Sequence, residues 1–176
     1  MAFAHEKLIA DIPDYPKPGV VFKDITPLLA DPEGLAALID DIADHFADAG
    51  VTKIMGAESR GFMVGAPVAY KLGVGFVPAR KPGKLPREVI TQEYALEYGT
   101  DALQIHADAV GPDDVVLLVD DLLATGGTAA AMYKLATRAG AKVAGYGFLM
   151  ELEFLNPRET LSEVSDVEVY SLVKVQ

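Results

Sequence analysis

The sequence has no cysteine. This absence excludes a disulfide framework, a zinc site built from thiolates and a cysteine nucleophile. Basic residues are also scarce, since 15 lysines and arginines stand against 26 aspartates and glutamates and leave a formal net charge of −11. Contacts to phosphates dominate nucleic-acid binding and need clustered Lys and Arg, so we expect no nucleic-acid partner.

Long apolar runs are missing as well. No stretch approaches the roughly 20 apolar residues that a membrane-spanning helix requires. The amino-terminal segment MAFAHEKLIADIPDYP mixes charges into its apolar residues, unlike a signal peptide. We therefore expect a cytoplasmic protein without a membrane partner. The length of 176 residues and the hydrophobic fraction of 51% suit one compact domain with a proper core.

Segments with the patterns of strands and helices alternate along the chain. In the first long helix, Asp31 is placed to cap the amino terminus, Pro32 takes the first position and Gly50 can end the helix. Apolar runs without alternation predict strands that are buried on both faces. The pattern predicts helices over residues 31–50, 61–73 and 127–139, strands over 51–57, 74–80, 114–119, 142–150 and 167–175, and a hairpin-like pair over 92–99 and 101–110.

This order predicts an α/β fold with a central parallel sheet flanked by helices. In such sheets, ligands bind beyond the carboxyl ends of the strands. Three of the predicted strands run into polar segments, which are GAESRG, ARKPGK and VDDLLATGG. Because the carboxyl ends of parallel strands meet at one edge, we expect all three segments to line the same rim.

The third of these segments contains a turn that suits an anion. The turn consists of Ala124, Thr125, Gly126, Gly127 and Thr128 and leads into a helix, where free backbone N–H groups and the helix dipole attract a phosphate monoester. Glycines alone would equally suit tight packing at the start of a helix, but the threonine hydroxyls favour the phosphate. A Walker-type loop is excluded because no Gly-Lys-Ser/Thr follows.

Asp120 and Asp121 end the strand before this turn. Since side chains alternate along a strand, we expect one of them to face the cleft and the other to face the opposite side. A carboxylate beside a phosphate site can accept hydrogen bonds from neutral hydroxyls, such as those of a ribose, or hold Mg²⁺ directly or through water. For either residue alone, a helix cap or a solvated side chain is an alternative.

The segment VVLLVDDLLATGGT resembles the 5-phosphoribosyl-1-pyrophosphate (PRPP) signature of the type I phosphoribosyltransferase family. The resemblance implies that the turn holds the ribose 5′-phosphate and that the two aspartates hold the ribose 2′- and 3′-hydroxyls. Four further segments, PKPGVVFKDITPLLADP, GAESRGF, RKPGKLP and YALEYG, resemble the members that act on adenine, in the same order and over nearly the whole chain. The implied reaction converts adenine and PRPP into AMP and pyrophosphate, with Mg²⁺ as the cofactor.

The resemblance also implies roles for single residues. Glu97 is the expected general acid/base near N7 of adenine, and the peptide bond between Glu58 and Ser59 is expected to be cis. Without the resemblance, Arg60 suits a surface ion pair and Glu97 suits an exposed strand edge. The implied catalytic residues are Glu97, Arg60 and Lys81, the implied pyrophosphate contacts are Glu58, Ser59, Arg60, Lys81, Lys84 and Tyr98, and the implied adenine contacts are Val21, Phe22, Lys23 and Leu155.

Three larger features are also implied by the resemblance. A small hood is built from about residues 1–30 and the C-terminal part, a flexible catalytic loop covers about residues 81–95, and the enzyme is a homodimer. Two other functions stay open. One is a phosphoribosyltransferase for hypoxanthine, guanine or xanthine. The other is a non-catalytic sensor of PRPP or a purine, which is disfavoured because such regulators add a DNA-binding module and basic clustering is absent here.

Overall fold

The computed structural model describes residues 2–96 and 98–176 and centres on a five-stranded sheet. The strand order is β4-β3-β7-β8-β9, and every neighbouring pair is parallel. All carboxyl ends therefore share one edge, with β7 in the middle. The strands are β3 (Lys53–Ala57), β4 (Gly75–Ala79), β7 (Val115–Leu123), β8 (Lys142–Leu152) and β9 (Glu168–Val175).

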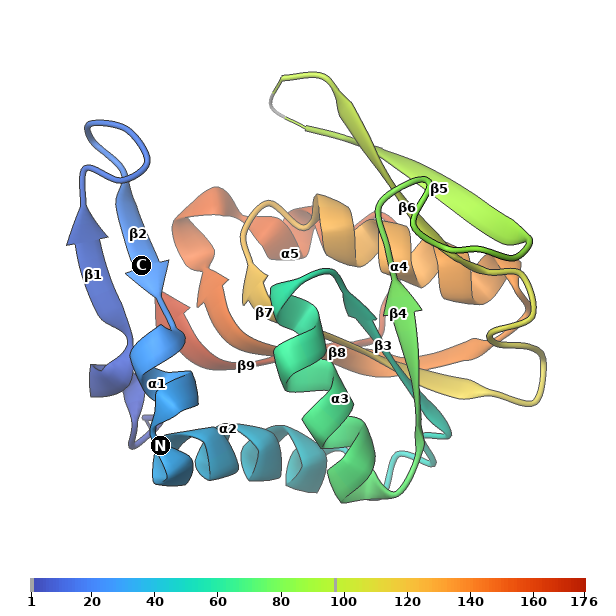
Figure 1. The fold of residues 1–176 in the computed structure, drawn as a ribbon, viewed down its shortest axis with the longest axis horizontal. Coiled ribbons are helices and arrows are strands. Elements are labelled where there is room, and N and C mark those ends of the chain that lie inside the picture. Colours follow the sequence, from blue (N-terminus) through green and yellow to red (C-terminus); the bar gives the residue numbers. More distant parts are fainter. Residues whose placement is uncertain (1, 97) are drawn as a thin grey trace.

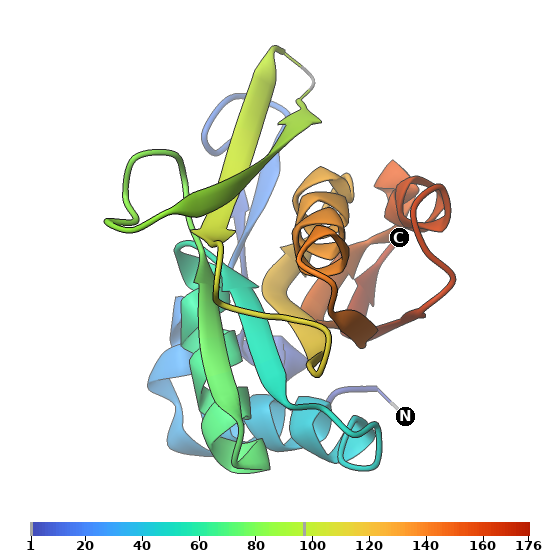
Figure 2. The ribbon, with the colours of Figure 1, turned by 90° about the vertical axis from the view of Figure 1, so that its right-hand side faces the viewer.

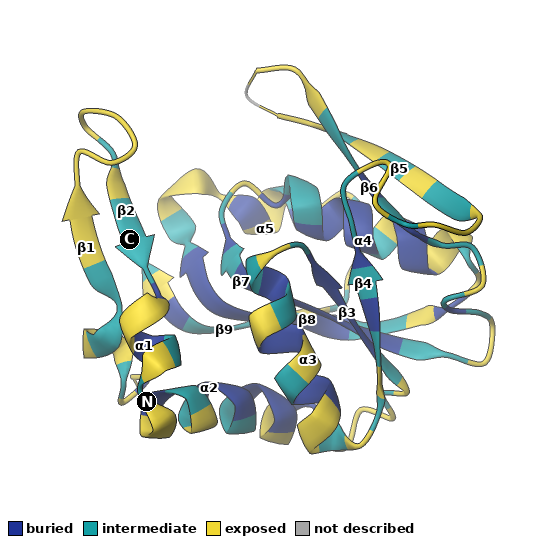
Figure 3. Cartoon of the chain, viewed as in Figure 1, coloured by how far each residue is buried: buried dark blue, intermediate teal, exposed yellow. Residues whose placement is uncertain are grey.

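Helices cover both faces of this sheet (Figure 1). The helices α2 (Pro32–His45) and α3 (Arg60–Leu72) pack on one face, whereas α4 (Gly127–Arg138) packs on the other, beside the short α5 (Pro157–Ser162). An apolar cluster lies under each helical layer and forms the dark interior of Figure 3. Within the described residues, none of the helices combines the length and the apolar character that crossing a membrane requires.

Two antiparallel hairpins stand outside the sheet. The first lies beside the C-terminal end of the chain (Figure 1), and the second rises above α4 and the carboxyl end of β4 (Figure 2). Backbone hydrogen bonds of 2.8 and 2.7 Å between Arg80 and Gln104 fasten the second hairpin to the end of β4. The hairpins are β1 (Ala10–Pro13) with β2 (Val21–Asp24) and β5 (Val89–Ala95) with β6 (Thr100–His106); the short helix α1 (Thr26–Ala30) and 3₁₀ turns at Glu6–Leu8 and Glu153–Leu155 complete the elements.

The predicted α/β fold and the order of its elements are confirmed. Asp31 caps α2 as expected, with its carboxylate 2.7 Å from the backbone nitrogen of Gly34. The predicted helix end at Gly50 is wrong, because α2 ends at His45 and tighter bonds, such as Ala47 N–H to the Asp44 carbonyl, take over. The expected loop over about 81–95 is shorter than predicted, because residues 89–95 pair with β6 as a strand.

Phe46 tests the packing between α2 and the sheet. Its ring is 2% exposed and lies against β8, where a Cβ on Gly145 would come within 2.8 Å of Phe46 Cε1. Removal of such a ring leaves a cavity, so Phe46→Ala should lower the free energy of unfolding by about 3–5 kcal/mol in urea denaturation. The control Phe154→Ala, whose ring is 60% exposed, should change it by less than about 1 kcal/mol. Equal losses would contradict this assignment of the core.

Candidate active site

The carboxyl ends of β3, β4 and β7 surround a cavity of about 240 Å³. All three of the polar segments that follow these strands contribute to its wall, so their predicted convergence is confirmed. The helix α4 and the β5–β6 hairpin close the remaining sides. The wall contains polar side chains and the turn before α4. The polar side chains outside the turn are those of Glu58, Ser59, Arg60, Lys81, Tyr94, Asp120 and Asp121, and the turn contributes Ala124, Thr125, Gly126 and Thr128.

The turn between β7 and α4 lines the cavity with Ala124, Thr125 and Gly126. Gly126 has a φ of +90°, a left-handed conformation that glycine adopts without strain, and no side chain caps the helix that follows. A Cβ on Gly126 would lie 3.0 Å from the carbonyl oxygen of Pro157 and 3.1 Å from Cβ of Thr160, so α5 backs the turn closely. The uncapped first turn of α4 favours an anion at this place.

Asp120 and Asp121 both face the start of α3. Asp121 is 4% exposed, and its Oδ2 lies 3.0 Å from Nε of Arg60. In Asp120, Oδ1 accepts the N–H of Asp121 at 2.9 Å and lies 2.8 Å from the place that a Cβ on Gly61 would take, so only glycine leaves room there. The expectation that the two carboxylates face opposite sides of the sheet is therefore wrong.

The cause is a break in the alternation of side chains along β7 near its carboxyl end. Leu117 and Val119 belong to the apolar cluster under α2 and α3. Strict alternation would keep Leu123 on that side, but Leu123 packs in the cluster under α4, together with Leu118. The strand thus reverses its faces between residues 119 and 123, and the two aspartates lie within this reversal.

Burial and a neighbouring charge act together on Asp120. Burial raises the pKa of Asp120 well above its usual value, the negative charge of Asp121 raises it further, and Arg60 offsets only part of the shift. A carboxyl group in these surroundings is stabilised by any ligand group that donates hydrogen bonds or positive charge to it. Ribose hydroxyls and a divalent cation both meet this requirement.

Arg60 connects the cavity to the β1–β2 hairpin. Its Cζ lies 5.8 Å from the ring centre of Phe22, within the range of a cation–π contact. Phe22 is half-buried, whereas Val21 is 53% exposed and Lys23 pairs with a carboxylate of β1 at 2.6 Å. None of these three lines the cavity, and neither does Leu155, which is 41% exposed on the 3₁₀ turn after β8.

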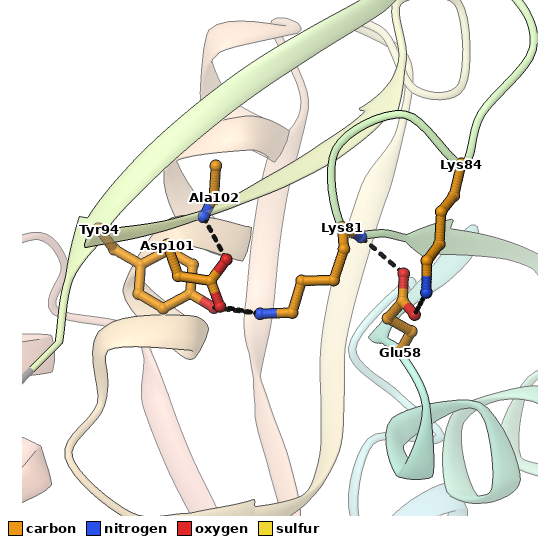
Figure 4. A network of polar contacts seen from close by, with 6 residues as sticks. All are labelled: Glu58, Lys81, Lys84, Tyr94, Asp101 and Ala102. Carbon is orange, nitrogen blue, oxygen red and sulfur yellow. Dashed lines mark hydrogen bonds and ion pairs between the residues drawn. The ribbon is translucent and has the colours of Figure 1, made fainter. Parts of the chain in front are cut away.

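The segment after β3 turns its carboxylate toward the loop that follows β4. The peptide bond between Glu58 and Ser59 is cis, as the resemblance predicts. Oε1 of Glu58 accepts the N–H of Lys81 at 2.6 Å, and Oε2 lies 2.6 Å from Nζ of Lys84 (Figure 4). Burial opposes ionisation of this carboxyl, but Lys84 and the N–H of Lys81 lower the pKa of Glu58 overall. Lys84 is thus held beside the cavity and does not line it.

Lys81 extends in the opposite direction, toward the β5–β6 hairpin (Figure 4). Its ammonium group contacts Asp101 and lies 3.1 Å from the hydroxyl of Tyr94. Tyr94 begins the segment YALEYG, but no role for Tyr94 or Asp101 is predicted from the sequence, and the register of the hairpin brings the two together. Tyr98 is 84% exposed near the tip of the hairpin and does not line the cavity. Glu97 lies outside the described residues.

The donor set limits how a metal ion can be held. Within residues 2–96 and 98–176, no group of three or more His, Asp or Glu side chains is arranged to hold one. Asp120 and Asp121 do offer the carboxylate oxygens that Mg²⁺ prefers. These residues fit an ion that takes most of its ligands from a substrate and from water.

The turn before α4 suits a phosphate, and the two adjacent carboxylates suit neutral hydroxyls. Together they indicate a protein that binds a sugar phosphate. Comparison with known families agrees with this class. The family model described as phosphoribosyl transferase domain matches residues 24–172. The chain belongs to the phosphoribosyltransferase family.

The relatives that this chain resembles include adenine phosphoribosyltransferases. The enzyme of Aeromonas salmonicida is 55% identical over 170 residues, which are 97% of this chain and 93% of that protein. The crystal structure of the Thermoanaerobacter pseudethanolicus enzyme has a TM-score of 0.90 and 49% identity, and the match covers 96% of both chains. The Trypanosoma brucei enzyme in complex with AMP, pyrophosphate and ribose-5-phosphate has a TM-score of 0.87 and 27% identity, over 96% of this chain and 77% of that one.

The raised pKa of Asp120, a partly buried carboxyl group, predicts a pH-dependent effect on stability. A carboxyl whose pKa is raised on folding destabilises the folded protein above the pKa of the unfolded chain, near 3.8, and has no effect below it. Asp120→Asn should therefore raise the thermal midpoint by a few degrees at about pH 7, and this gain should vanish near pH 3. Calorimetry over a pH series measures both.

Asp108→Asn serves as the matched control. The guanidinium of Arg87 lowers the pKa of Asp108, so removal of this charge should give no gain in stability at neutral pH. A lower thermal midpoint for Asp120→Asn than for the unsubstituted protein at about pH 7 would contradict the electrostatic account of the site.

Proposed function

We propose that the protein transfers the 5-phosphoribosyl group from PRPP to N9 of adenine and releases AMP and pyrophosphate, a reaction of purine salvage. The observation that carries this proposal is one cavity in which an anion-binding turn adjoins two carboxylates. A ligand that fits both must present a phosphate to the amides and neutral hydroxyls to the acids. Ribose 5-phosphate has this combination, and the Trypanosoma brucei relative contains it together with AMP and pyrophosphate.

In the proposed complex, the 5′-phosphate lies in the turn formed by residues 124–128, with hydrogen bonds from the backbone amides and from Thr125 and Thr128. The ribose 2′- and 3′-hydroxyls donate hydrogen bonds to Asp120 and Asp121. The raised pKa of Asp120 supports this role, because hydroxyl donors stabilise the ionised carboxylate that burial disfavours.

The pyrophosphate occupies the side of the cavity that carries Ser59, Arg60 and Lys81. As its bond to C1′ breaks, negative charge develops on the pyrophosphate, and fixed cations stabilise this charge. Arg60 suits the role because a guanidinium binds phosphate oxygens in a bidentate manner. Glu58 holds the loop through Lys81 and Lys84, so that its own charge is compensated, and Lys84 and Tyr98 complete the outer edge of the proposed pyrophosphate site.

Adenine binds against the hood that we propose for about residues 1–30 and the C-terminal part. Phe22 stacks on the base, the backbone of Val21 reads its edge, Leu155 covers the other face and Lys23 lies nearby. The exposure of Val21 and Leu155 supports this arrangement, because the aromatic faces of a bound purine would cover both side chains. Glu97 is the proposed general acid/base for the proton at N7.

Mg²⁺ is the proposed cofactor. When bound, it supplies positive charge to pyrophosphate oxygens and to the ribose hydroxyls. Asp120 or Asp121 would hold it, directly or through water, and orient the ribose beside the phosphate turn. Arg60 and Lys81 bind the leaving group from the protein side, while the loop from about residue 81 onward excludes water from the reacting centre.

We also propose that the enzyme is a cytoplasmic homodimer. PRPP and AMP are phosphorylated and are therefore retained inside cells. On α3, the helix after β3, Met63 and Tyr70 are 43% and 90% exposed, and apolar and aromatic side chains of this kind are enriched at subunit interfaces. Sedimentation equilibrium should give a mass close to twice 18.7 kDa, and a monomer at micromolar concentration would contradict this proposal.

The choice of base distinguishes this function from its rivals. The other purines present a different hydrogen-bonding edge, so they would leave the protein groups that bind the adenine edge unpaired. We therefore expect kcat/KM for hypoxanthine, guanine or xanthine to be at least about 100-fold lower than for adenine. Release of pyrophosphate with each base measures the ratio. Equal use of hypoxanthine would indicate a different purine phosphoribosyltransferase, whereas PRPP binding without turnover of any base would indicate a sensor.

Arg60→Lys tests the pyrophosphate side without leaving Asp121 unpaired. Lysine keeps the positive charge but cannot bind two phosphate oxygens in a planar fork, so kcat/KM for PRPP should fall about tenfold or more. The control is Arg138→Lys, because Arg138 is exposed at the end of α4, bonds to the backbone of β5 and does not line the cavity. Unchanged kinetics for Arg60→Lys would show that Arg60 only stabilises the fold.

A further inference from the structure

Asp101 stands behind Lys81 as seen from the cavity. Lys81 and Tyr94 line the cavity wall, whereas Asp101 does not. The ammonium group of Lys81 contacts Asp101 Oδ2 and the hydroxyl of Tyr94, and this hydroxyl lies 3.3 Å from the same carboxylate (Figure 4). The ammonium group of Lys81, the carboxylate of Asp101 and the hydroxyl of Tyr94 therefore each contact the other two.

The hairpin fixes the place of Asp101. Tyr94 on β5 and Asp101 on β6 are direct cross-strand partners, so their side chains stand on the same face of the hairpin. The second carboxylate oxygen of Asp101 accepts the backbone N–H of Ala102 at 2.8 Å, which fixes the orientation of the group. The bridge between Arg80 and Gln104 in turn holds the hairpin against the residue that precedes Lys81.

Lys81 and Asp101 each favour the charged form of the other. The hydrogen bond from Lys81 lowers the pKa of Asp101, in spite of partial burial. Burial opposes the charge of Lys81, but its bonds to Asp101 and Tyr94 raise the pKa of Lys81 overall. Both groups are therefore charged at neutral pH.

We propose that Asp101 is a positioning residue that holds the ammonium group of Lys81 at the cavity wall, ready to bind pyrophosphate. The inference rests on the proposed function, in which Lys81 contacts that group. An ammonium has three N–H donors, and Asp101 and Tyr94 accept two of them. The third remains for a phosphate oxygen. A long side chain that is already fixed loses less conformational entropy when the ligand binds.

Asp101→Asn tests the proposal with little change in shape. The amide keeps an oxygen for the N–H of Ala102 but removes the charge that holds Lys81, so KM for PRPP should rise about tenfold, as expected for the loss of a hydrogen bond to a charged group. KM for adenine should stay unchanged, and Asp101→Glu should recover part of the affinity for PRPP. The matched control is Asp108→Asn, which removes an aspartate charge from an exposed pair outside the cavity and should leave both constants unchanged.

A double-mutant cycle separates positioning from a structural role. If Asp101 acts through Lys81, then Asp101→Asn should have no further effect on KM for PRPP in a protein that already carries Lys81→Ala. An equal rise in KM in both backgrounds would show that Asp101 only supports the hairpin and would overturn the proposal. A lower KM in Asp101→Asn alone would overturn it as well, because Asp101 would then compete with pyrophosphate for Lys81.

The proposed function is tested separately by AMP formation in the unsubstituted protein. If AMP forms but Lys81→Ala leaves KM for PRPP unchanged, the inference fails while the proposed function stands. Circular dichroism and the thermal midpoint of each variant establish that it is folded. Should Asp101→Asn fail to fold, the comparison of Asp101→Glu with the unsubstituted protein, in both Lys81 backgrounds, gives the same cycle.

Discussion

The ion pair between Arg60 and Asp121 joins the first residue of α3 to the carboxyl end of β7, with 3.0 Å between Nε and Oδ2. Two adjacent carboxylates at this edge repel each other, and the guanidinium offsets part of that repulsion. The same guanidinium lines the cavity and lies over Phe22. One arginine therefore links Asp121, the cavity wall and Phe22, which belong to the proposed ribose, pyrophosphate and base sites.

Close packing at two glycines makes this arrangement possible. Gly61 lets the carboxylate of Asp120 lie against the start of α3, and Gly126 lets the phosphate turn lie against α5. A side chain at either position would displace a group that we propose to bind the substrate. The site also lowers stability, because the partly buried carboxylate of Asp120, whose pKa is raised, destabilises the folded chain at neutral pH. Hydrogen bonds from the hydroxyls of a bound ribose phosphate should therefore offset part of this loss of stability.

The sequence is sufficient for the fold and for the rim of the site, because both follow from local patterns. Apolar runs separated by helices predict a parallel sheet, and polar residues after three strands predict where their ends meet. The directions of Asp120 and Asp121 could not be predicted, because the reversal of β7 depends on packing against two helical layers. The contact of Tyr94 and Asp101 with Lys81 could not be predicted either, because it depends on the register of the β5–β6 hairpin, which the segment YALEYG does not reveal.

The most direct test of the central claim is a crystal structure of the protein with AMP. The account predicts the 5′-phosphate in the turn at Ala124–Thr128, the ribose hydroxyls within hydrogen-bond distance of Asp120 and Asp121, and the base against Phe22. A nucleotide bound elsewhere, or a phosphate on the Arg60 side with the turn left to solvent, would contradict it.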